Sequence, residues 1–284
     1  MYSRYCRSML FTPATAENRY ASCHQSGADI CLVDLEDSVP AASKEAGRRR
    51  AAGFFAAAGS SGTLARYAVR INAITEPDGL ADLLALRAYP VKPGIVLVPK
   101  VESARDLEIV DAVLGSDCPD LQLMALIETP RALERLYSIV TGNRRLRALV
   151  FGAADYVALA GCRLDWDPLV YARSRIVNCA RAAGLYAIDT PYFGLADPSL
   201  LRQEAGRAHE FGFSGKVALH PNQVAVLNET FSPDLAELKH AHQVVSALTG
   251  EGVTTVDGSM VGPPFLAASK RLLDEFDQLG STRP

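Results

Sequence analysis

The sequence predicts an α/β fold, a (β/α)₈ TIM barrel with a helical, lid-like C-terminal extension, and two observations lead to it. Eight short runs are rich in Val, Ile and Leu without polar alternation, which is typical of parallel strands covered on both faces. Stretches with helical patterns lie between these runs, and parallel neighbours need crossovers of this kind. The chain of 284 residues is long enough, since barrels commonly extend to roughly 250 residues in one domain. The apolar runs are residues 8–13, 30–36, 67–72, 94–100, 121–128, 148–152, 186–191 and 216–220.

Start signals for helices follow several of these runs. Helices are predicted to begin near Glu17, Pro40, Glu102 and Pro130, the last standing where the first turn of a helix tolerates proline. The main alternative is an open, doubly wound sheet, which typically carries a G-x-G-x-x-G turn after an early strand. Because this motif does not occur in the sequence, the pattern favours the closed barrel.

Beyond His220 the pattern changes and predicts a tail longer than a barrel needs. The expected elements are a crossover, a helix, a glycine-rich break, an extended segment and a second helix, at residues 221–228, 234–249, 250–252, 253–261 and 263–279. No Pro/Ser-rich linker separates them from the barrel. We therefore expect a barrel over residues 1–230 and an extension over residues 231–284, which packs on the barrel or on a neighbouring subunit as part of the same domain.

The composition argues against several classes of protein. Hydrophobic residues make up 49% of the chain, which is ample for a core. The 29 basic and 32 acidic residues give a net charge of −3, so no basic face for nucleic acid or for an anionic membrane is expected. No apolar run approaches the roughly 20 residues of a membrane span, and Pro13 ends the short run that a signal peptide would need. The 6 cysteines are scattered without metal-ligand spacing, as in a reducing compartment, so a cytoplasmic protein is expected.

Polar residues gather where the predicted strands end, which is the face where barrel enzymes carry their active sites. Glu128 and Asp155 each follow an apolar run, and the two runs are neighbours in the predicted barrel. The sixth predicted strand continues through Gly152 to Asp155. Two oxygen ligands without Cys or His nearby suit Mg²⁺, which keeps positions for water and substrate. Spacing alone is equally compatible with helix-capping roles for both acids. His220 ends the eighth run, but a histidine there is as often structural, so no role is assigned to it.

Arg70 lies within a predicted buried strand, where an arginine is costly unless it meets an anion. Its planar guanidinium suits a carboxylate or a thioester oxygen, and a structural ion pair with Asp34, Glu36 or Asp37 is the alternative. These three acids cannot all be ionised and buried without cations, for which Lys44 and Arg70 are the candidates. We expect the acids and Lys44 to order the arginine and metal-bound water rather than to bind the metal directly.

Six segments taken together make the sequence recognisable. They resemble the citrate lyase β-subunit-like group of acyl-CoA lyases, which includes malyl-CoA and citramalyl-CoA lyases, from residue 7 to about residue 273. The resemblance implies an Mg²⁺-dependent (β/α)₈ barrel, assembled as a trimer or hexamer, that cleaves a carbon–carbon bond in a 3-hydroxyacyl-CoA. The segments are Arg7 to Pro13, Gly27 to Lys44, Val69 to Asn72, Ile127 to Thr129, Phe151 to Tyr156 and Leu219 to Gln223.

The resemblance also implies roles for individual residues. Glu128 and Asp155 look like the two metal ligands, with Glu128 also beside the substrate, and Arg70 looks like the residue that grips substrate oxygens. Mg²⁺ would lower the pKa of the substrate hydroxyl, and collapse of the alkoxide would expel an acetyl-CoA enolate whose charge Arg70 stabilises. The positions that contact substrate or CoA in the family match Phe11 and the backbone of Val217 and Ala218.

One departure from the family concerns the tail. Lyases of this group carry a Met-x-Asp-x-Pro segment, whose Asp acts as acid/base in the active site of a neighbouring subunit. Here the segment reads Met260-Val261-Gly262-Pro263-Pro264, so a glycine takes the place of that Asp. Asp257, three residues before Met260, is the candidate replacement.

The leading hypothesis is a lyase that converts citramalyl-CoA, malyl-CoA or a citryl-CoA type of substrate into acetyl-CoA and a keto acid. A CoA-independent aldolase on the same metal site is one alternative. A non-catalytic, ligand-binding paralogue is another, which Gly262 invites. The expected partners are a small acyl-CoA or keto acid and further copies of the chain, without nucleic acid or membrane.

Overall fold

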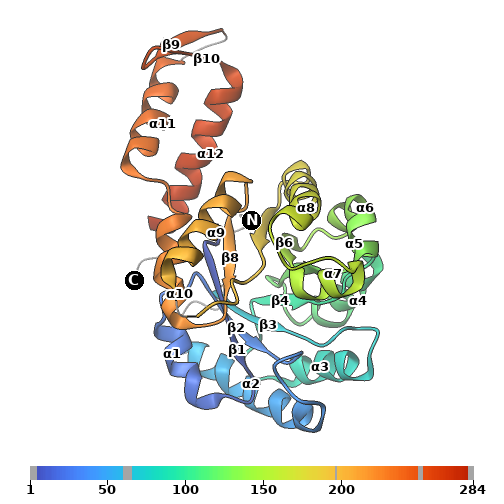
Figure 1. The fold of residues 1–284 in the computed structure, drawn as a ribbon. Coiled ribbons are helices and arrows are strands. Elements are labelled where there is room, and N and C mark those ends of the chain that lie inside the picture. The colour runs from blue at the N-terminus through green and yellow to red at the C-terminus, as the bar shows by residue number, and fades with distance from the viewer. Residues whose placement is uncertain (1–4, 60–65, 196, 249–251, 281–284) are drawn as a thin grey trace.

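A computed structural model describes residues 5–59, 66–195, 197–248 and 252–280 and shows a closed barrel of eight parallel strands (Figure 1). The strands follow one another in chain order around the ring, and β1 pairs with β8 to close it. The predicted (β/α)₈ barrel is therefore confirmed. The barrel strands are β1 (Ser8–Pro13), β2 (Ile30–Asp34), β3 (Tyr67–Arg70), β4 (Ile95–Val98), β5 (Gln122–Ile127), β6 (Leu146–Phe151), β7 (Tyr186–Asp189) and β8 (Gly215–Ala218).

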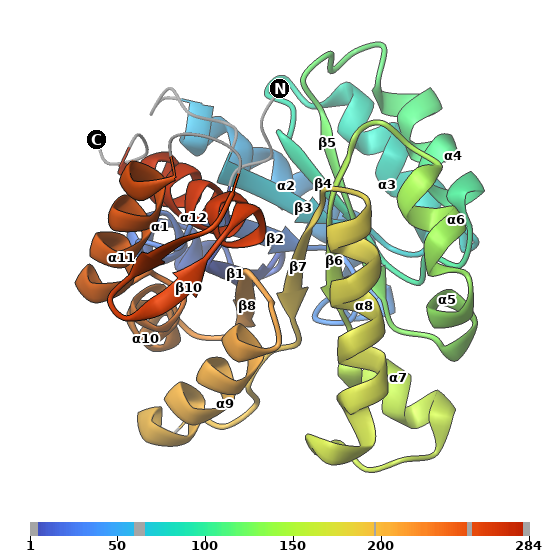
Figure 2. The ribbon, with the colours of Figure 1, turned by 90° about the horizontal axis from the view of Figure 1, so that it is seen from above.

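Helices surround the strands (Figure 2), and several begin at the predicted signals. Ser103 caps α4 in a capping box with Asp106, and Pro130 is the first residue of α5, which Thr129 caps. No helix in the described ranges has the length and hydropathy needed to cross a bilayer. The α-helices are α1 (Tyr20–Gln25), α2 (Lys44–Gly59), α3 (Pro77–Ala88), α4 (Ala104–Leu114), α5 (Pro130–Glu134), α6 (Leu136–Thr141), α7 (Ala153–Ala160), α8 (Val170–Ala182), α9 (Pro198–Glu210), α10 (Pro221–Thr230), α11 (Leu235–Ala247) and α12 (Pro263–Gly280).

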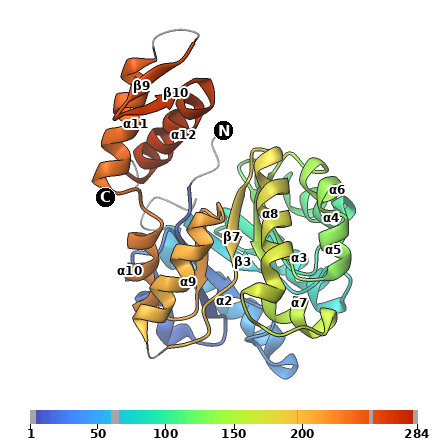
Figure 3. The same cartoon turned by 45° about the horizontal axis from the view of Figure 1, so that its top comes forward.

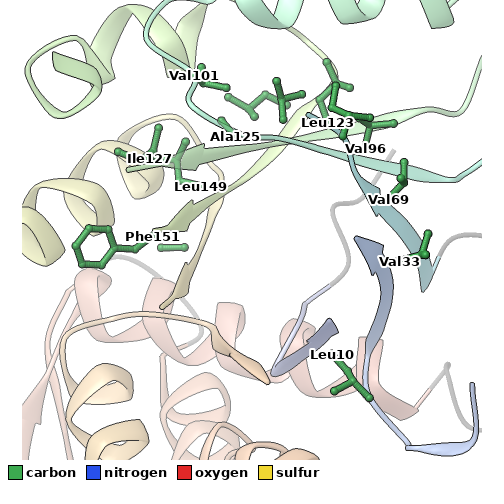
Figure 4. Close-up of a cluster of buried hydrophobic side chains, with 14 of the residues drawn as sticks. Leu10, Val33, Val69, Val96, Val101, Leu123, Ala125, Ile127, Leu149 and Phe151 are labelled. Atoms are coloured by element: carbon green, nitrogen blue, oxygen red, sulfur yellow. The ribbon is translucent and has the colours of Figure 1, made fainter. Parts of the chain in front are cut away.

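The barrel wall separates two apolar layers. Successive side chains of a strand point to opposite faces, so Met9 of β1 points into the barrel while Leu10 packs in the layer under the helices. Because both faces are buried, the strands need no polar alternation, which explains the continuous apolar runs of the sequence. Figure 4 shows part of the outer layer, including Leu10, Val33, Val69, Ile127 and Phe151.

A buried ion cluster lies in the outer layer beside β7 and β8. Lys216, which is fully buried, contacts Asp189 at 2.6 Å and Glu204 of α9 at 2.7 Å. Arg173 of α8 donates from Nε to Asp189 Oδ1 at 3.1 Å. Two cations therefore meet two carboxylates, and this balance is what makes burial of the charges tolerable.

The C-terminal extension forms an arm that projects from the barrel (Figures 1 and 3). It consists of α11, α12 and the hairpin of β9 (Thr254–Val256) and β10 (Ser259–Val261), which share a small apolar core. The predicted helices are present, whereas residues 249–251, with most of the predicted glycine-rich break, lie outside the described residues. The division into residues 1–230 and 231–284 stays a prediction.

The arm is attached at the face where the strands begin. Gln278 of α12 accepts a hydrogen bond from the backbone N–H of Tyr5, just before β1, at 3.0 Å. Glu275 of α12 lies 3.7 Å from Arg181, at the end of α8 before β7. The barrel mouth, where the strands end, is therefore on the opposite side from the attachment of the arm.

We expect Asp189→Ala to lower the free energy of unfolding by about 3–5 kcal/mol, because Arg173 and Lys216 lose their shared carboxylate inside the protein. Urea unfolding followed by circular dichroism measures this. Asp117→Ala is the control, since Asp117 pairs with Arg87 on the surface and exposed pairs contribute little. Equal effects of the two substitutions would contradict the role of the buried cluster.

Candidate metal and substrate site

The barrel mouth collects buried polar side chains from several strand ends. Because the strands are all parallel around the ring, the residues that follow them meet at one face, as expected from the sequence. The buried polar residues there include Asp34, Glu36, Arg70, Asn72, Glu128, Thr129 and Thr190.

Glu128 directly follows β5 and is 1% exposed. Its Oε1 accepts a hydrogen bond from the backbone N–H of Lys100 at 2.7 Å. Over the described ranges, Oε2 has no hydrogen bond, and no ion pair reaches this carboxylate. A Cβ on Gly152 would lie 2.6 Å from Oε2, so only glycine leaves the carboxylate its space. Burial, followed by the charge of Glu36, raises the pKa of Glu128 to about 8.

Asp155 lies in the first turn of α7, because β6 ends at Phe151. The prediction that the sixth strand continues to Asp155 is wrong, since the chain turns into the helix at Gly152. The first turn of a helix favours a carboxylate. The negative charge of Asp155 contributes to the raised pKa of Glu128, so the two acids are close enough to interact electrostatically.

These two carboxylates fit a hard divalent cation better than they fit capping roles. Thr129, not Glu128, caps α5, and the N-cap of α7 makes no side-chain hydrogen bond. No group of three His, Cys, Asp or Glu side chains able to hold a metal occurs in the part of the chain that the structure describes. Mg²⁺ typically uses one or two carboxylates and completes its shell with water and substrate. The buried, unpaired Glu128 is the observation that favours a cation.

Arg70 ends β3 and pairs with three acids. Its Nε and Nη2 each lie 2.7 Å from an oxygen of Asp34, and its Nη1 lies 2.9 Å from Glu36 and 3.4 Å from Asp37. The structural ion pair that the sequence left as an alternative is therefore present. Burial acts to raise the pKa of Asp34, but Arg70 outweighs it, so the net shift is downward. The guanidinium lies 5.1 Å from the ring of Phe11, which brings Phe11 to the mouth.

Glu36 lies between two cations, with Arg70 Nη1 at 2.9 Å and Lys100 Nζ at 3.3 Å. Burial raises the pKa of Glu36 to about 7, against the opposing effect of Arg70. Glu36 and Glu128 are thus two buried acids that share one mouth, and each makes ionisation of the other less favourable.

Lys44 does not neutralise the acid cluster, which corrects the sequence interpretation. Its Nζ donates to the backbone carbonyls of Leu35 and Glu36 at 2.8 Å and to the side-chain oxygen of Asn72. Since these acceptors use the ammonium group, Lys44 orders the ends of β2 and β3. The second cation beside the acids is Lys100.

Sequence reasoning missed the roles of two residues that contact Glu128, namely Lys100 and Gly152. Each is the last residue of an apolar run, and this position was the only sign in the sequence that it would lie near the mouth. Both act on Glu128 from neighbouring strands, and a single sequence shows no contacts across strands. His220 accepts a hydrogen bond from the backbone N–H of Asn222 and caps α10, as its structural interpretation predicts.

The three positions that the resemblance assigns to substrate or CoA contact, Phe11, Val217 and Ala218, differ in their burial. Val217 points into the barrel and Ala218 into the outer layer, and both side chains are buried. A contact of their backbone with substrate or CoA stays a prediction. Phe11 is partly exposed at the end of β1.

The tail residues lie far from the mouth of their own barrel. Asp257 and Gly258 form the turn between β9 and β10, and Asp257 contacts His240 at 3.2 Å. A Cβ on Gly262 would lie 3.0 Å from Val253, so glycine keeps this end of the hairpin tight. Because the hairpin is at the outer part of the arm (Figure 3), neither Asp257 nor Gly262 reaches the mouth within one chain.

A pocket of about 400 Å³ lies on the outside of the barrel, between α8 and α9. Its walls include Trp166, Phe193, Arg173 and Glu204. Arg173 and Glu204 are already paired with the buried cluster, and the guanidinium of Arg173 stacks 4.2 Å from Trp166. Arg173 and Glu204 of this pocket therefore already have partners of opposite charge, whereas in the described ranges no ion pair reaches Glu128 at the mouth.

Comparison with known proteins identifies the family. The sequence profile of the HpcH/HpaI aldolase/citrate lyase family matches residues 7–221. The chain belongs to this family. The citrate lyase β-like resemblance is thereby confirmed.

Family members of known name match over nearly the whole chain. Citrate lyase subunit beta of Escherichia coli strain K12 is 31% identical, covering 98% of this chain and 95% of its own. A (3S)-malyl-CoA thioesterase of Cereibacter sphaeroides is 32% identical, covering 98% and 96%. The solved CitE of Mycobacterium tuberculosis in complex with magnesium, acetoacetate and coenzyme A is 29% identical, with a TM-score of 0.78 over 95% of this chain and 97% of that one.

Magnesium is the metal found in these family structures. A second CitE structure holds magnesium together with oxaloacetate, at 30% identity, a TM-score of 0.69, and coverage of 81% of this chain and 98% of that one. The prediction of Mg²⁺ as cofactor is confirmed at the level of the family. The trimeric or hexameric state and the cytoplasmic location stay predictions.

We expect Gly152→Ala to weaken Mg²⁺ binding at least about tenfold, because the added methyl group would occupy the space of Glu128 Oε2. Isothermal titration calorimetry measures the affinity. Gly206→Ala is the control, since a Cβ there meets nothing within 4 Å and Gly206 lies on α9. Unchanged affinity in Gly152→Ala would contradict the placement of the metal beside Glu128.

We expect the metal-free protein to lose stability relative to Glu128→Gln as the pH rises from about 5 to 8. With its pKa raised from 4.5 to about 8, folded Glu128 binds a proton that the unfolded chain has already released. The stability of wild type is thus highest at the acidic end of this window, while Mg²⁺ affinity rises toward the alkaline end because the ion binds the carboxylate. Thermal unfolding with EDTA and with Mg²⁺ at each pH measures both trends. A stability difference between wild type and Glu128→Gln that does not change with pH would refute the titration of Glu128.

Proposed function

We propose that this protein is a magnesium-dependent lyase that cleaves a 3-hydroxyacyl-CoA of the citramalyl-, malyl- or citryl-CoA type into acetyl-CoA and a keto acid. The proposal is supported by a buried carboxylate without a cation, Glu128, beside Asp155 and Arg70 at the mouth of a barrel of this family. Acidic groups at the mouth outnumber the cations paired with them, which favours a divalent ion.

In this proposal Glu128 and Asp155 hold the ion through carboxylate oxygens. Bound Mg²⁺ would supply polarisation of the hydroxyl and carboxylate oxygens of the substrate. Lys100 and Gly152 keep the Glu128 carboxylate in place without using Oε2. The two hydrogen bonds to Asp34 fix the plane of the Arg70 guanidinium. Its Nη1, which also pairs with Glu36 and Asp37, is the nitrogen on the side away from Asp34 and is the one offered to substrate oxygens.

Cleavage transfers negative charge to the thioester fragment, and Arg70 is the cation placed to stabilise it. The enolate carbon then needs a proton. Gly262 carries no acid, and Asp257 lies away from the mouth of its own chain. Asp257 could therefore serve only from a neighbouring copy, where its contact with His240 would hold its carboxylate in place.

Thioester hydrolysis is the second candidate function. It is favoured by the malyl-CoA thioesterase relative and by the glycine at position 262. A hydrolase directs water at the thioester carbonyl and does not need to protonate an enolate carbon. The two reactions release different products, so they can be separated directly.

The deciding experiment incubates the protein and Mg²⁺ with citramalyl-CoA or malyl-CoA and follows keto acid and free thiol together. We expect pyruvate or glyoxylate without free CoA thiol, and loss of this product in Glu128→Gln by at least about a hundredfold. Arg87→Gln is the control, because Arg87 lies in the last turn of α3 in an exposed ion pair with Asp117.

Other outcomes identify the alternatives. Thiol without keto acid would indicate a thioesterase. Keto acid released from the free hydroxy acid would indicate a CoA-independent aldolase. Tight binding of Mg²⁺ and a keto acid without any product would indicate a non-catalytic paralogue and would contradict the lyase.

A further inference from the structure

Lys100 has an unusual backbone conformation. Its φ is +50°, and Asp257 is the only other non-glycine residue with positive φ in the described ranges. Asp257 precedes a glycine in a tight hairpin turn, where this conformation is common. Lys100 instead follows β4, where an extended or helical backbone would be available. A side chain in this region is strained and persists only where the surroundings impose it, often at functional sites.

The residues on either side of Lys100 hold its backbone in this conformation. Val98 before it and Val101 after it are both 0% exposed, so the chain is anchored in the core on either side. Between these anchors the backbone N–H of Lys100 points at Glu128 Oε1, at 2.7 Å. Because Val98 and Val101 are fixed, the positive φ of Lys100 can be relieved by rotating the Pro99–Lys100 peptide plane. This rotation would move the N–H of Lys100 away from Glu128.

The side chain of Lys100 reaches a second acid of the mouth. Its Nζ lies 3.3 Å from Glu36 Oε1 and 3.8 Å from Glu76. One residue thus holds Glu128 through its backbone and Glu36 through its ammonium group. Glu128 is limited on its other side by Gly152.

We propose that Lys100 is a positioning residue for the metal, whose left-handed backbone directs its N–H to Glu128 Oε1 and so leaves Oε2 free for the divalent ion. This inference rests on the proposed role of Glu128 as a ligand. Lys100 acts through Glu128 and does not itself contact the ion. The ammonium group is a separate contribution, because it acts on Glu36.

The test compares substitutions at position 100 that all lack the ammonium group but differ in how well they adopt positive φ. Glycine adopts it freely, an unbranched side chain adopts it with strain, and a β-branched one opposes it. Mn²⁺ is the probe, and its affinity is measured by electron paramagnetic resonance of the free ion, without substrate. We expect Lys100→Val to bind Mn²⁺ about tenfold more weakly than Lys100→Gly, with Lys100→Met between them.

Thermal unfolding with EDTA, read alongside, shows whether each variant is folded. If Lys100→Val does not fold, Lys100→Ala against Lys100→Gly makes the same comparison with less strain, and the expected order is the same. Equal Mn²⁺ affinities in the folded variants would overturn the positioning role. Glu128→Gln distinguishes this result from an error in the metal assignment. If Glu128→Gln binds Mn²⁺ as well as wild type, Glu128 is not a ligand. If Glu128→Gln loses Mn²⁺ while the Lys100 variants bind it equally, only the role of Lys100 is wrong.

Discussion

A buried carboxylate without a neighbouring protein cation is the constraint on which the mouth of this barrel depends. Glu128 accepts one backbone hydrogen bond, and its carboxylate occupies the space that a Cβ on residue 152 would fill. In the described ranges no cationic side chain pairs with it. Such a group is either protonated or matched by an external cation. The pKa of about 8 describes the first case, and in our proposal a magnesium ion provides the second. The surrounding geometry is consistent with a site that is completed by an ion.

The two charge clusters of the barrel differ in their balance of charge. In the outer layer, Lys216 and Arg173 meet Asp189 and Glu204, and each charge has a partner. At the mouth, acids outnumber the cations, and Lys100 is 38% exposed. The balanced cluster joins β7 and β8 to α8 and α9, whereas the excess of acids at the mouth supports our proposal that a cation binds there.

The arm and the carboxylates of the mouth lie at opposite ends of the barrel. The arm is attached where the strands begin, through Tyr5 and Arg181, while the carboxylates lie where the strands end. A residue of the hairpin can therefore meet a mouth only on another copy of the chain. Position 262 is a glycine where the resemblance predicts an acid, so the reaction that we propose depends more strongly on the residues of the barrel itself.

The sequence by itself determined the barrel, because the uninterrupted apolar runs and the intervening helices admit few other topologies. It also determined that Arg70, Glu128 and the acids of residues 34–37 stand at strand ends, since position relative to a run is readable from one chain. The tertiary structure decided what each of them touches. It assigned Arg70 to Asp34, took Lys44 away from the acids, moved Asp155 from a strand to a helix and brought Lys100 and Gly152 to Glu128. The physical reason is that pairing across strands depends on register and on the ends of elements, and neither is encoded in local periodicity.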